Sequence, residues 1–518
     1  MNTRSHTLRN TLYSSVGMYT EYVLGMLTSI IIARHLGPDD FGAYSLVIWL
    51  VAMGIAITNS GTASAAIKFV AELRGSEQPR MIPILLDYLR RAQRYFLVFV
   101  LVAGGLLFLT IGDRVAPNMN HAVLLGFLII AVALRASYMF NIGVAKGFED
   151  FRATAMVALI STPINLALVI MAWLFNAPVE WLLAIFLISS LVFLMVSSRQ
   201  ISPLVPERIE GVELPGPLMD RVRRHMGWTA LTVSVGFLAA SEVEVLFLNL
   251  YADSHAAGQF KVAFQLAIGA SALVPGVFGA LLLPMMANAL SRGREAAGRR
   301  FVASTAYLAL LALPLVAFGA VFSTAVIHVM YGQEFLPAGP VFAFCLAATG
   351  ITTITLGGSS LLVSADRQRS ILMLVTAFAA LKIIAGALLI SRFGLTGAVM
   401  SFVLVAVVSA VAMMALAIKV SQAMPEWGRL MRIALAATLA ALIVLPMRGY
   451  LLPWAQVVFG GLVLAGSYAP LTLLLGCWTR GDIEHLQQLH QRFVSGRPRV
   501  GARFLEWAHA RAGAGEMT

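Results

Sequence analysis

The feature that most constrains this chain is its succession of apolar runs. A helix needs about 20 mainly apolar residues to cross the roughly 30 Å hydrocarbon core of a bilayer. Runs of that length recur along the whole sequence, and only 12% of the 518 residues are charged, against roughly 25% in a soluble chain. Lipid must therefore solvate much of this surface, and we expect an all-α polytopic membrane protein.

The runs predict about fourteen transmembrane helices. Their expected residue ranges are 11–35, 41–70, 93–113, 121–145, 153–175, 179–199, 226–250, 258–290, 301–329, 338–363, 371–391, 395–419, 430–447 and 453–478. Two of them, 41–70 and 258–290, are longer than a bilayer requires, so we expect these helices to tilt or bend.

The basic residues predict the orientation, because cytoplasmic loops of membrane proteins are enriched in Lys and Arg. With the N-terminus inside, fourteen spans place 30 of the 37 basic residues on the cytoplasmic side. The sequence therefore predicts a multi-pass protein of a bacterial inner membrane with both termini in the cytoplasm. The exceptions are Arg34, Arg114, Arg135, Lys261, Lys382, Arg392 and Arg448.

The loops predict how the helices are grouped. A proline-rich cytoplasmic linker at 201–225 separates two expected six-helix lobes, 1–200 and 226–420. Gly42 and Tyr44 recur in the second lobe as Gly258 and Phe260, which favours parallel repeats about an axis along the membrane normal. Two further helices occupy 430–478, and the basic tail at 479–518 is expected to form amphipathic helices on the inner membrane surface.

No pattern typical of an enzyme occurs in the sequence. It has no Walker loop, no G-x-S-x-G or H-E-x-x-H motif and no metal-ligand spacing, so we expect neither an enzyme nor a cofactor. The basic residues are dispersed among apolar runs, which argues against nucleic acid as a partner despite the net charge of +12.

Charged residues within the predicted spans are the candidate functional groups, because a charge near the bilayer centre costs about 2.5–3.5 kcal/mol on insertion scales. We expect a cationic cavity for an anionic substrate to contain Arg34, Arg135, Lys261 and Lys382. Neutral polar groups of the same cavity would be Asn59, Asn141 and Gln265. Candidate proton or cation sites are Glu21, Glu242 and Glu244.

Each of these assignments has a structural alternative. Lys261 could pair with Glu242 or Glu244, and Arg34 could extend to the outer interface. If Glu242 and Glu244 lie on one continuous helix, they point about 200° apart, so at most one of them can face a cavity squarely.

Several segments resemble the polysaccharide transport family of Wzx-type O-antigen and exopolysaccharide flippases, in the multidrug/oligosaccharidyl-lipid/polysaccharide superfamily. They are IIIARHLGPDDFGAYSLVIWL in the first helix-loop-helix, GTASAAIKFVAE, GFEDFRATAMVALIS from Gly147, and GQFKVAFQL and LLLPMMANAL. The resemblance implies two six-helix lobes and two extra helices that work by alternating access. The implied cargo is an undecaprenyl-pyrophosphate-linked oligosaccharide that moves from the inner to the outer leaflet, with a polymerase and a chain-length regulator as partners.

Four alternative functions remain open from the sequence. A peptidoglycan-precursor flippase or a multidrug exporter belongs to the same superfamily, although exporters usually have twelve helices. A membrane-embedded polysaccharide polymerase or ligase would need a large external loop, which the predicted topology lacks. A purely structural membrane protein would not need charges within its spans.

Overall fold

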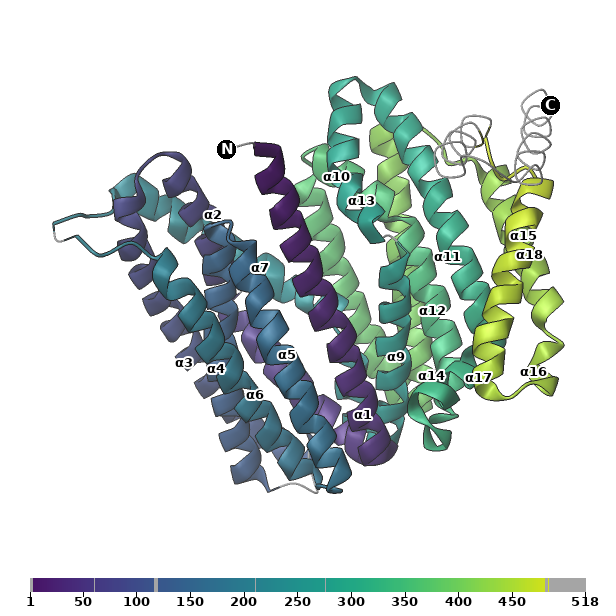
Figure 1. Cartoon of the computed structure of the whole chain (residues 1–518), viewed down its shortest axis with the longest axis horizontal. Coiled ribbons are helices and arrows are strands. Elements are labelled where there is room, and N and C mark those ends of the chain that lie inside the picture. Colours follow the sequence, from purple (N-terminus) through teal and green to yellow (C-terminus); the bar gives the residue numbers. More distant parts are fainter. Residues whose placement is uncertain are drawn as a thin grey trace. The chain divides into compact units, whose positions relative to one another are not determined.

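The computed structural model describes residues 3–59, 61–115, 120–209, 211–274, 276–479 and 483, and their regular elements are all helical (Figure 1). The first part of the chain forms α1 (Thr3–Asn59), α2 (Thr62–Gly75), η1 (Pro79–Met81), α3 (Ile82–Val115), α4 (His121–Gly147), α5 (Phe151–Leu174), α6 (Val179–Ile201), η2 (Ser202–Leu204), α7 (Gly216–Ala240) and α8 (Val243–Tyr251). The rest forms α9 (Ser254–Leu273), α10 (Gly276–Ser291), α11 (Arg294–Tyr331), η3 (Gln333–Phe335), α12 (Ala338–Ile354), α13 (Leu356–Ser364), α14 (Gln368–Ser421), α15 (Trp427–Val444), α16 (Met447–Tyr450), α17 (Pro453–Ala455), η4 (Gln456–Gly460) and α18 (Gly461–Leu474). The predicted tail at 479–518 lies outside the described residues, apart from Thr479 and Ile483.

The helices confirm a multi-pass membrane protein. Ten of the described helical stretches are long and apolar enough to cross a bilayer, and α7 with α8 makes up to eleven if this bent pair is one span. Straight helices as long as the 57-residue α1 and the 54-residue α14 would measure about 85 and 81 Å, far more than the roughly 30 Å needed. Each is interrupted by a glycine with non-helical angles, Gly37 (φ 70°) or Gly394 (φ 52°), so each contains two helical segments. The number of fourteen crossings stays a prediction.

Both of the spans that were expected to bend are divided in the structure. The expected span at 41–70 comprises the end of α1 and the separate helix α2. The expected span at 258–290 comprises α9 and α10. The linker predicted at 201–225 is shorter, because α7 already begins at Gly216.

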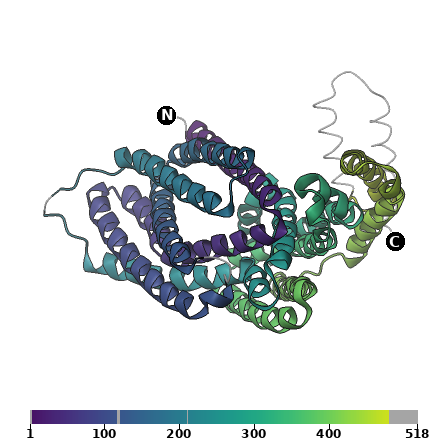
Figure 2. The ribbon, with the colours of Figure 1, turned by 90° about the horizontal axis from the view of Figure 1, so that it is seen from below.

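The chain divides into two compact units. Unit 1 contains Met1–Lys261 and Val375–Ala398, and unit 2 contains Val262–Leu374 and Val399–Thr518. In unit 1, α1 packs most extensively against α5, and α4 packs against α6 and α2. In unit 2, α11 packs against α12 and α15, and Figures 1 and 2 both show α15 and α18 side by side. The expected lobes at 1–200 and 226–420 remain a prediction.

Each unit has its own apolar core. In unit 1, Phe69 of α2, Leu86 of α3 and Phe140 of α4 are almost fully buried in one cluster. In unit 2, Phe322 of α11 and Leu464 of α18 belong to another. These clusters hold the helices together by close packing, which is the main attractive term once helices lie in lipid.

Exposed apolar stripes mark the surfaces that suit lipid. On α3 the stripe recurs at helical spacing and consists of Tyr95, Phe99, Val102, Leu106 and Leu109, which are 57–77% exposed. On α6 a similar stripe consists of Ile188, Leu191 and Met195. In water such stripes would be costly, whereas acyl chains solvate them.

Two glycines of the predicted repeat approach the backbone of each other's segment. A Cβ on Gly42 would lie 1.8 Å from the carbonyl oxygen of Ser254, and a Cβ on Gly258 would lie 2.0 Å from that of Pro38. Each carbonyl belongs to the residue four positions before the other glycine. The contact is therefore reciprocal, and only glycine fits at either position.

A polar pair lies in the same place. Asp39 Oδ2 is 3.2 Å from His255 Nδ1, and each of these residues comes three positions before its segment's glycine. Equivalent positions thus contact each other, as expected if a local pseudo-two-fold axis relates the two segments. This geometry supports the predicted repeat.

Candidate functional site

Arg135 is held in unit 1 by three aromatic rings and a serine. Its Nε donates a hydrogen bond of 2.9 Å to Ser190 Oγ. Its guanidinium carbon lies 4.4 Å from the ring centroid of Phe193, 4.9 Å from that of Phe186 and 5.9 Å from that of Tyr138. Cation–π attraction offsets part of the cost of keeping this charge in an apolar helix bundle.

Arg135 lies near the middle of α4, a helix that is long and apolar enough to cross a bilayer. It follows His121 by fourteen residues, which is about 21 Å along a helix of about 40 Å. Among the described residues, no carboxylate lies within 4 Å of its guanidinium and neither terminal amino group has a hydrogen-bond partner. The end of the guanidinium fork is therefore available to an anion, because the aromatic rings and Ser190 hold the rest of the side chain.

The carboxylate of Glu21 on α1 influences Arg135 electrostatically. It is exposed, and it interacts electrostatically with Arg135 and Tyr138. The structure thus brings together two residues that the sequence placed in separate groups, an acidic coupling candidate and a cationic cavity candidate.

The second group of charges lies where one predicted span is broken. α7 ends at Ala240 and α8 begins at Val243, and the two helices differ in direction by 59°. The break interrupts the i→i−4 hydrogen-bond ladder between α7 and α8, and two short backbone bonds, Val243 N–H to Ser241 and Val245 N–H to Glu242, replace only part of it. Cations therefore suit the first helix end and carboxylates suit the second.

Lys382 of α14 and Glu244 of α8 occupy these two helix ends. The Nζ of Lys382 donates hydrogen bonds to the carbonyl oxygens of Ala239 (3.4 Å) and Ser241. It also lies 3.4 Å from Glu244 Oε2, with the two side chains only 3% and 1% exposed. The sequence offered no partner for Lys382, because Glu244 is distant along the chain.

Lys261 and Glu242 form the other ion pair at this break. The Nζ of Lys261 donates a hydrogen bond to Glu242 Oε1, and both side chains are 19% exposed. This is the alternative that the sequence left open for Lys261. Glu242 and Glu244 do not lie on one continuous helix, because Glu242 precedes α8 and has non-helical angles (φ −77°, ψ 63°). That at most one of them faces a cavity squarely stays a prediction. The four residues form a cluster without net charge.

Asn59 belongs to a buried amide network. Its Nδ2 donates to the carbonyl oxygen of Ala136 (2.9 Å), and Gln93 Nε2 donates to both Asn59 Oδ1 (2.7 Å) and that same carbonyl (2.9 Å). The network joins α1, α3 and α4 next to Arg135. Gln93 was missed in the sequence, because it stands at the predicted start of a span among arginines that were counted as cytoplasmic.

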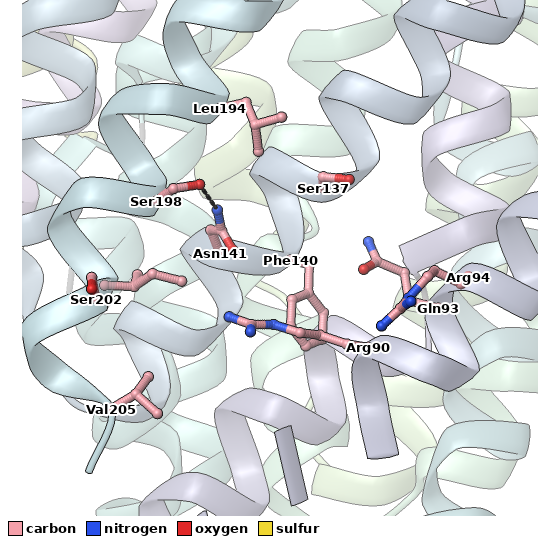
Figure 3. Close-up of a pocket in the computed structure, with 11 residues that line it drawn as sticks. Arg90, Gln93, Arg94, Ser137, Phe140, Asn141, Leu194, Ser198, Ser202 and Val205 are labelled. Carbon is pink, nitrogen blue, oxygen red and sulfur yellow. Dashed lines mark hydrogen bonds between the residues drawn. The ribbon is translucent and has the colours of Figure 1, made fainter. Parts of the chain in front are cut away.

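Asn141 lines a pocket of about 630 Å³ among α3, α4 and α6 (Figure 3). Its Nδ2 donates to Ser197 Oγ and Ser198 Oγ, both at 3.1 Å. The eleven lining residues are Arg90, Gln93, Arg94, Ser137, Phe140, Asn141, Leu194, Ser198, Ile201, Ser202 and Val205. Asn141 is thus a pocket residue, and the lining of this pocket does not include Arg135 or the charged residues of the α7–α8 break.

The remaining two candidates lie elsewhere. Arg34 is exposed near the end of the first segment of α1, and Gln265 is half-buried in the part of α9 that belongs to unit 2. No group of three or more metal-ligating side chains occurs in the part of the chain that the structure describes.

The fold is similar to that of solved flippases and transporters. The "Lipid II flippase MurJ, inward closed conformation" superposes with a TM-score of 0.72 and 11% identity, covering 90% of this chain and 98% of that one. An inward-facing multidrug resistance MATE family transporter of the MOP superfamily gives 0.62 at 13% identity (79% and 98%). A MOP superfamily transporter from Pyrococcus furiosus gives 0.54 at 15% identity (80% and 95%).

The sequence comparisons identify the family. No curated protein matches the chain in sequence. A family model described as polysaccharide biosynthesis protein matches residues 7–290, which is more than half of the chain and runs from within α1 to within α10. This chain therefore belongs to the polysaccharide biosynthesis protein family, with a MurJ- and MATE-like transporter fold.

Proposed function

We propose that this protein is a flippase of the inner membrane. It moves an undecaprenyl-pyrophosphate-linked oligosaccharide repeat unit from the inner to the outer leaflet for exopolysaccharide or O-antigen synthesis. Both termini lie in the cytoplasm, and the cargo passes on to a polymerase and a chain-length regulator. Alternating access provides the movement. Membership of the polysaccharide biosynthesis family and the flippase-like fold support this proposal.

The single observation that carries the proposal is the state of Arg135. The two lysine candidates at the α7–α8 break are ion-paired, so their charges are already matched. The terminal amino groups of Arg135 have no such partner among the described residues, and a guanidinium fork suits two phosphate oxygens at once. A cation held near the bilayer centre lowers the barrier to a pyrophosphate there, while the polyprenyl chain stays in lipid.

The membrane potential supplies a driving force for the proposed direction. An inside-negative potential favours outward movement of negative charge by about 2.3 kcal/mol per charge per 100 mV. A pyrophosphate with roughly two charges would therefore gain about 4–5 kcal/mol at 100 mV. Glu21, which is exposed and electrostatically linked to Arg135, is the candidate for an additional coupling to protons or cations.

The test replaces Arg135 in a strain whose surface polysaccharide depends on this protein. Arg135→Gln should reduce export about 10- to 100-fold, because it removes charge-assisted hydrogen bonds, and lipid-linked repeat units should accumulate in the inner leaflet. Arg135→Lys keeps the charge without the fork and should be intermediate. Arg448→Gln, at an exposed arginine, is the matched control and should export normally. Normal export by a correctly inserted Arg135→Gln variant would refute the assignment.

A second candidate function is transport of the peptidoglycan lipid precursor. The observation in its favour is the fit to the lipid II flippase fold over 90% of the chain. The same deletion strain separates the two: accumulated polysaccharide repeat units support the first function, and accumulated peptidoglycan precursor with cell lysis supports the second. A multidrug exporter is less well supported, since Arg135 would repel cationic drugs.

A further inference from the structure

The pocket among α3, α4 and α6 contains two arginines that the proposed transport step does not use. In Figure 3, Arg90 extends from α3 toward Asn141, and Arg94 lies beside Gln93. Within the described part of the chain, neither guanidinium has a hydrogen-bond or ion-pair partner. Two unmatched cations one helical turn apart are unfavourable unless an anion or water compensates them.

The rest of the lining complements an anion with hydroxyl groups. None of the eleven described residues that line the pocket is acidic. The nearest carboxylate along α3, that of Asp87, pairs with Arg208 at 3.1 Å. Ser137, Ser198 and Ser202 add hydroxyl groups, and the volume of about 630 Å³ is in the usual range for small-ligand sites.

The position of the pocket favours a lipid as the source of that anion. The exposed apolar stripe of α3 ends at Tyr95, directly after Arg94. The stripe of α6 runs through Met195 and continues at helical spacing into Ser198 and Ser202. Two acyl-compatible surfaces thus lead into one polar, basic pocket.

The pocket also lies at the level where headgroups are expected. Arg90 and Arg94 lie about 12–18 Å along α3 from its start. The neighbouring part of the chain belongs to the predicted cytoplasmic side, which has most of the basic residues. That side faces the leaflet in which anionic lipids attract basic groups. Leu194, Ile201 and Val205 line the pocket beside its polar groups. A lipid needs such a mixed surface where its polar headgroup joins its acyl chains.

We propose that this pocket binds the phosphate of an anionic phospholipid headgroup, with Arg90 and Arg94 contacting the phosphate and the serines and Asn141 contacting headgroup hydroxyl groups. The acyl chains lie along the stripes of α3 and α6. Neither Arg135 nor the charged residues at the α7–α8 break belong to the pocket's lining, and we therefore assign the pocket to an annular lipid rather than to the transported cargo.

The test measures the thermal midpoint of the full-length detergent-purified protein during titration with phosphatidylglycerol, with phosphatidylcholine as the neutral lipid. We expect a saturable rise with phosphatidylglycerol only. Arg90→Gln/Arg94→Gln should weaken the apparent affinity about 10- to 100-fold. Arg90→Lys/Arg94→Lys should weaken it less, because it keeps both charges. The matched control is Arg91→Gln, since Arg91 is an exposed arginine of the same helix that does not line the pocket, and it should behave as the wild type.

A separate arm identifies the source of the phosphate. Inorganic phosphate at the same concentration should produce no shift, because it cannot use the apolar stripes. An equal response of wild type and Arg90→Gln/Arg94→Gln to phosphatidylglycerol would overturn the site. A full response to inorganic phosphate would overturn the lipid as its ligand. Neither result would bear on export through Arg135, which is measured in cells.

Discussion

The buried ion pair between Lys382 and Glu244 should dominate the stability of unit 1 near the α7–α8 break. The perturbation is a double-mutant cycle with Lys382→Met, Glu244→Gln and the combined variant. At 3.4 Å and an effective dielectric constant of about 20, the two charges attract each other by about 5 kcal/mol. Both side chains are almost completely buried, so neither charge can be solvated when its partner is removed.

Loss of one partner from a buried pair costs about 3–5 kcal/mol. Glu244→Gln should lie at the lower end, because Lys382 keeps its hydrogen bonds to the carbonyl oxygens of Ala239 and Ser241. Lys382→Met should lie at the upper end, because it leaves Glu244 without a cation and the end of α7 without its cap. The combined variant should lose much less than the sum, since it leaves no unmatched charge.

The assay is unfolding by SDS in mixed micelles, followed by tryptophan fluorescence. We expect a coupling free energy of at least about 2 kcal/mol between the two sites. The pair Lys261–Glu242 is the internal comparison, and its greater exposure of 19% on each side chain should give a smaller coupling. Additive losses at Lys382 and Glu244 would refute the reasoning, because independent sites cannot form a mutually stabilising pair.

Two further substitutions test other contacts. Gly42→Ala should destabilise the protein by about 1–3 kcal/mol or more, because its Cβ would lie 1.8 Å from the Ser254 carbonyl oxygen. Thermal melting measures the loss, and Gly25→Ala, which has open space around it, should show none. Gln93→Leu should cost about 1–3 kcal/mol, because it removes a hydrogen bond from the buried Asn59 side chain, and the same SDS titration would contradict the network if the variant matched the wild type.

The sequence was sufficient for the class of fold because apolar runs determine where helices can lie in lipid. It also singled out Arg135, Lys261 and Lys382 as candidates, since a charge inside an apolar run is conspicuous. The break at Ser241–Glu242 could not be foreseen, because no glycine or proline stands there. The carbonyl oxygens at the end of α7 are satisfied by Lys382, which comes from a distant helix.

Arg90 and Arg94 were missed for a different reason. Basic residues at the predicted end of a span are normally explained by orientation alone, and the sequence contains no sign that α4 and α6 form a pocket around them. Whether an arginine of α3 lines the pocket depends on which face of the helix it occupies. Only the packing of three helices reveals that difference.

The reciprocal contact of Gly42 and Gly258 has a consequence for the origin of the chain. In each segment a glycine packs against the carbonyl oxygen of the residue four positions before the other segment's glycine. Asp39 and His255, which contact each other, occupy equivalent positions of the two segments. A contact of this kind is isologous, as in a two-fold homodimer. A single ancestral half would need only one glycine and one loop to pair with a second copy of itself. Gene duplication and fusion would then preserve the contact while allowing Asp and His to diverge into a complementary pair.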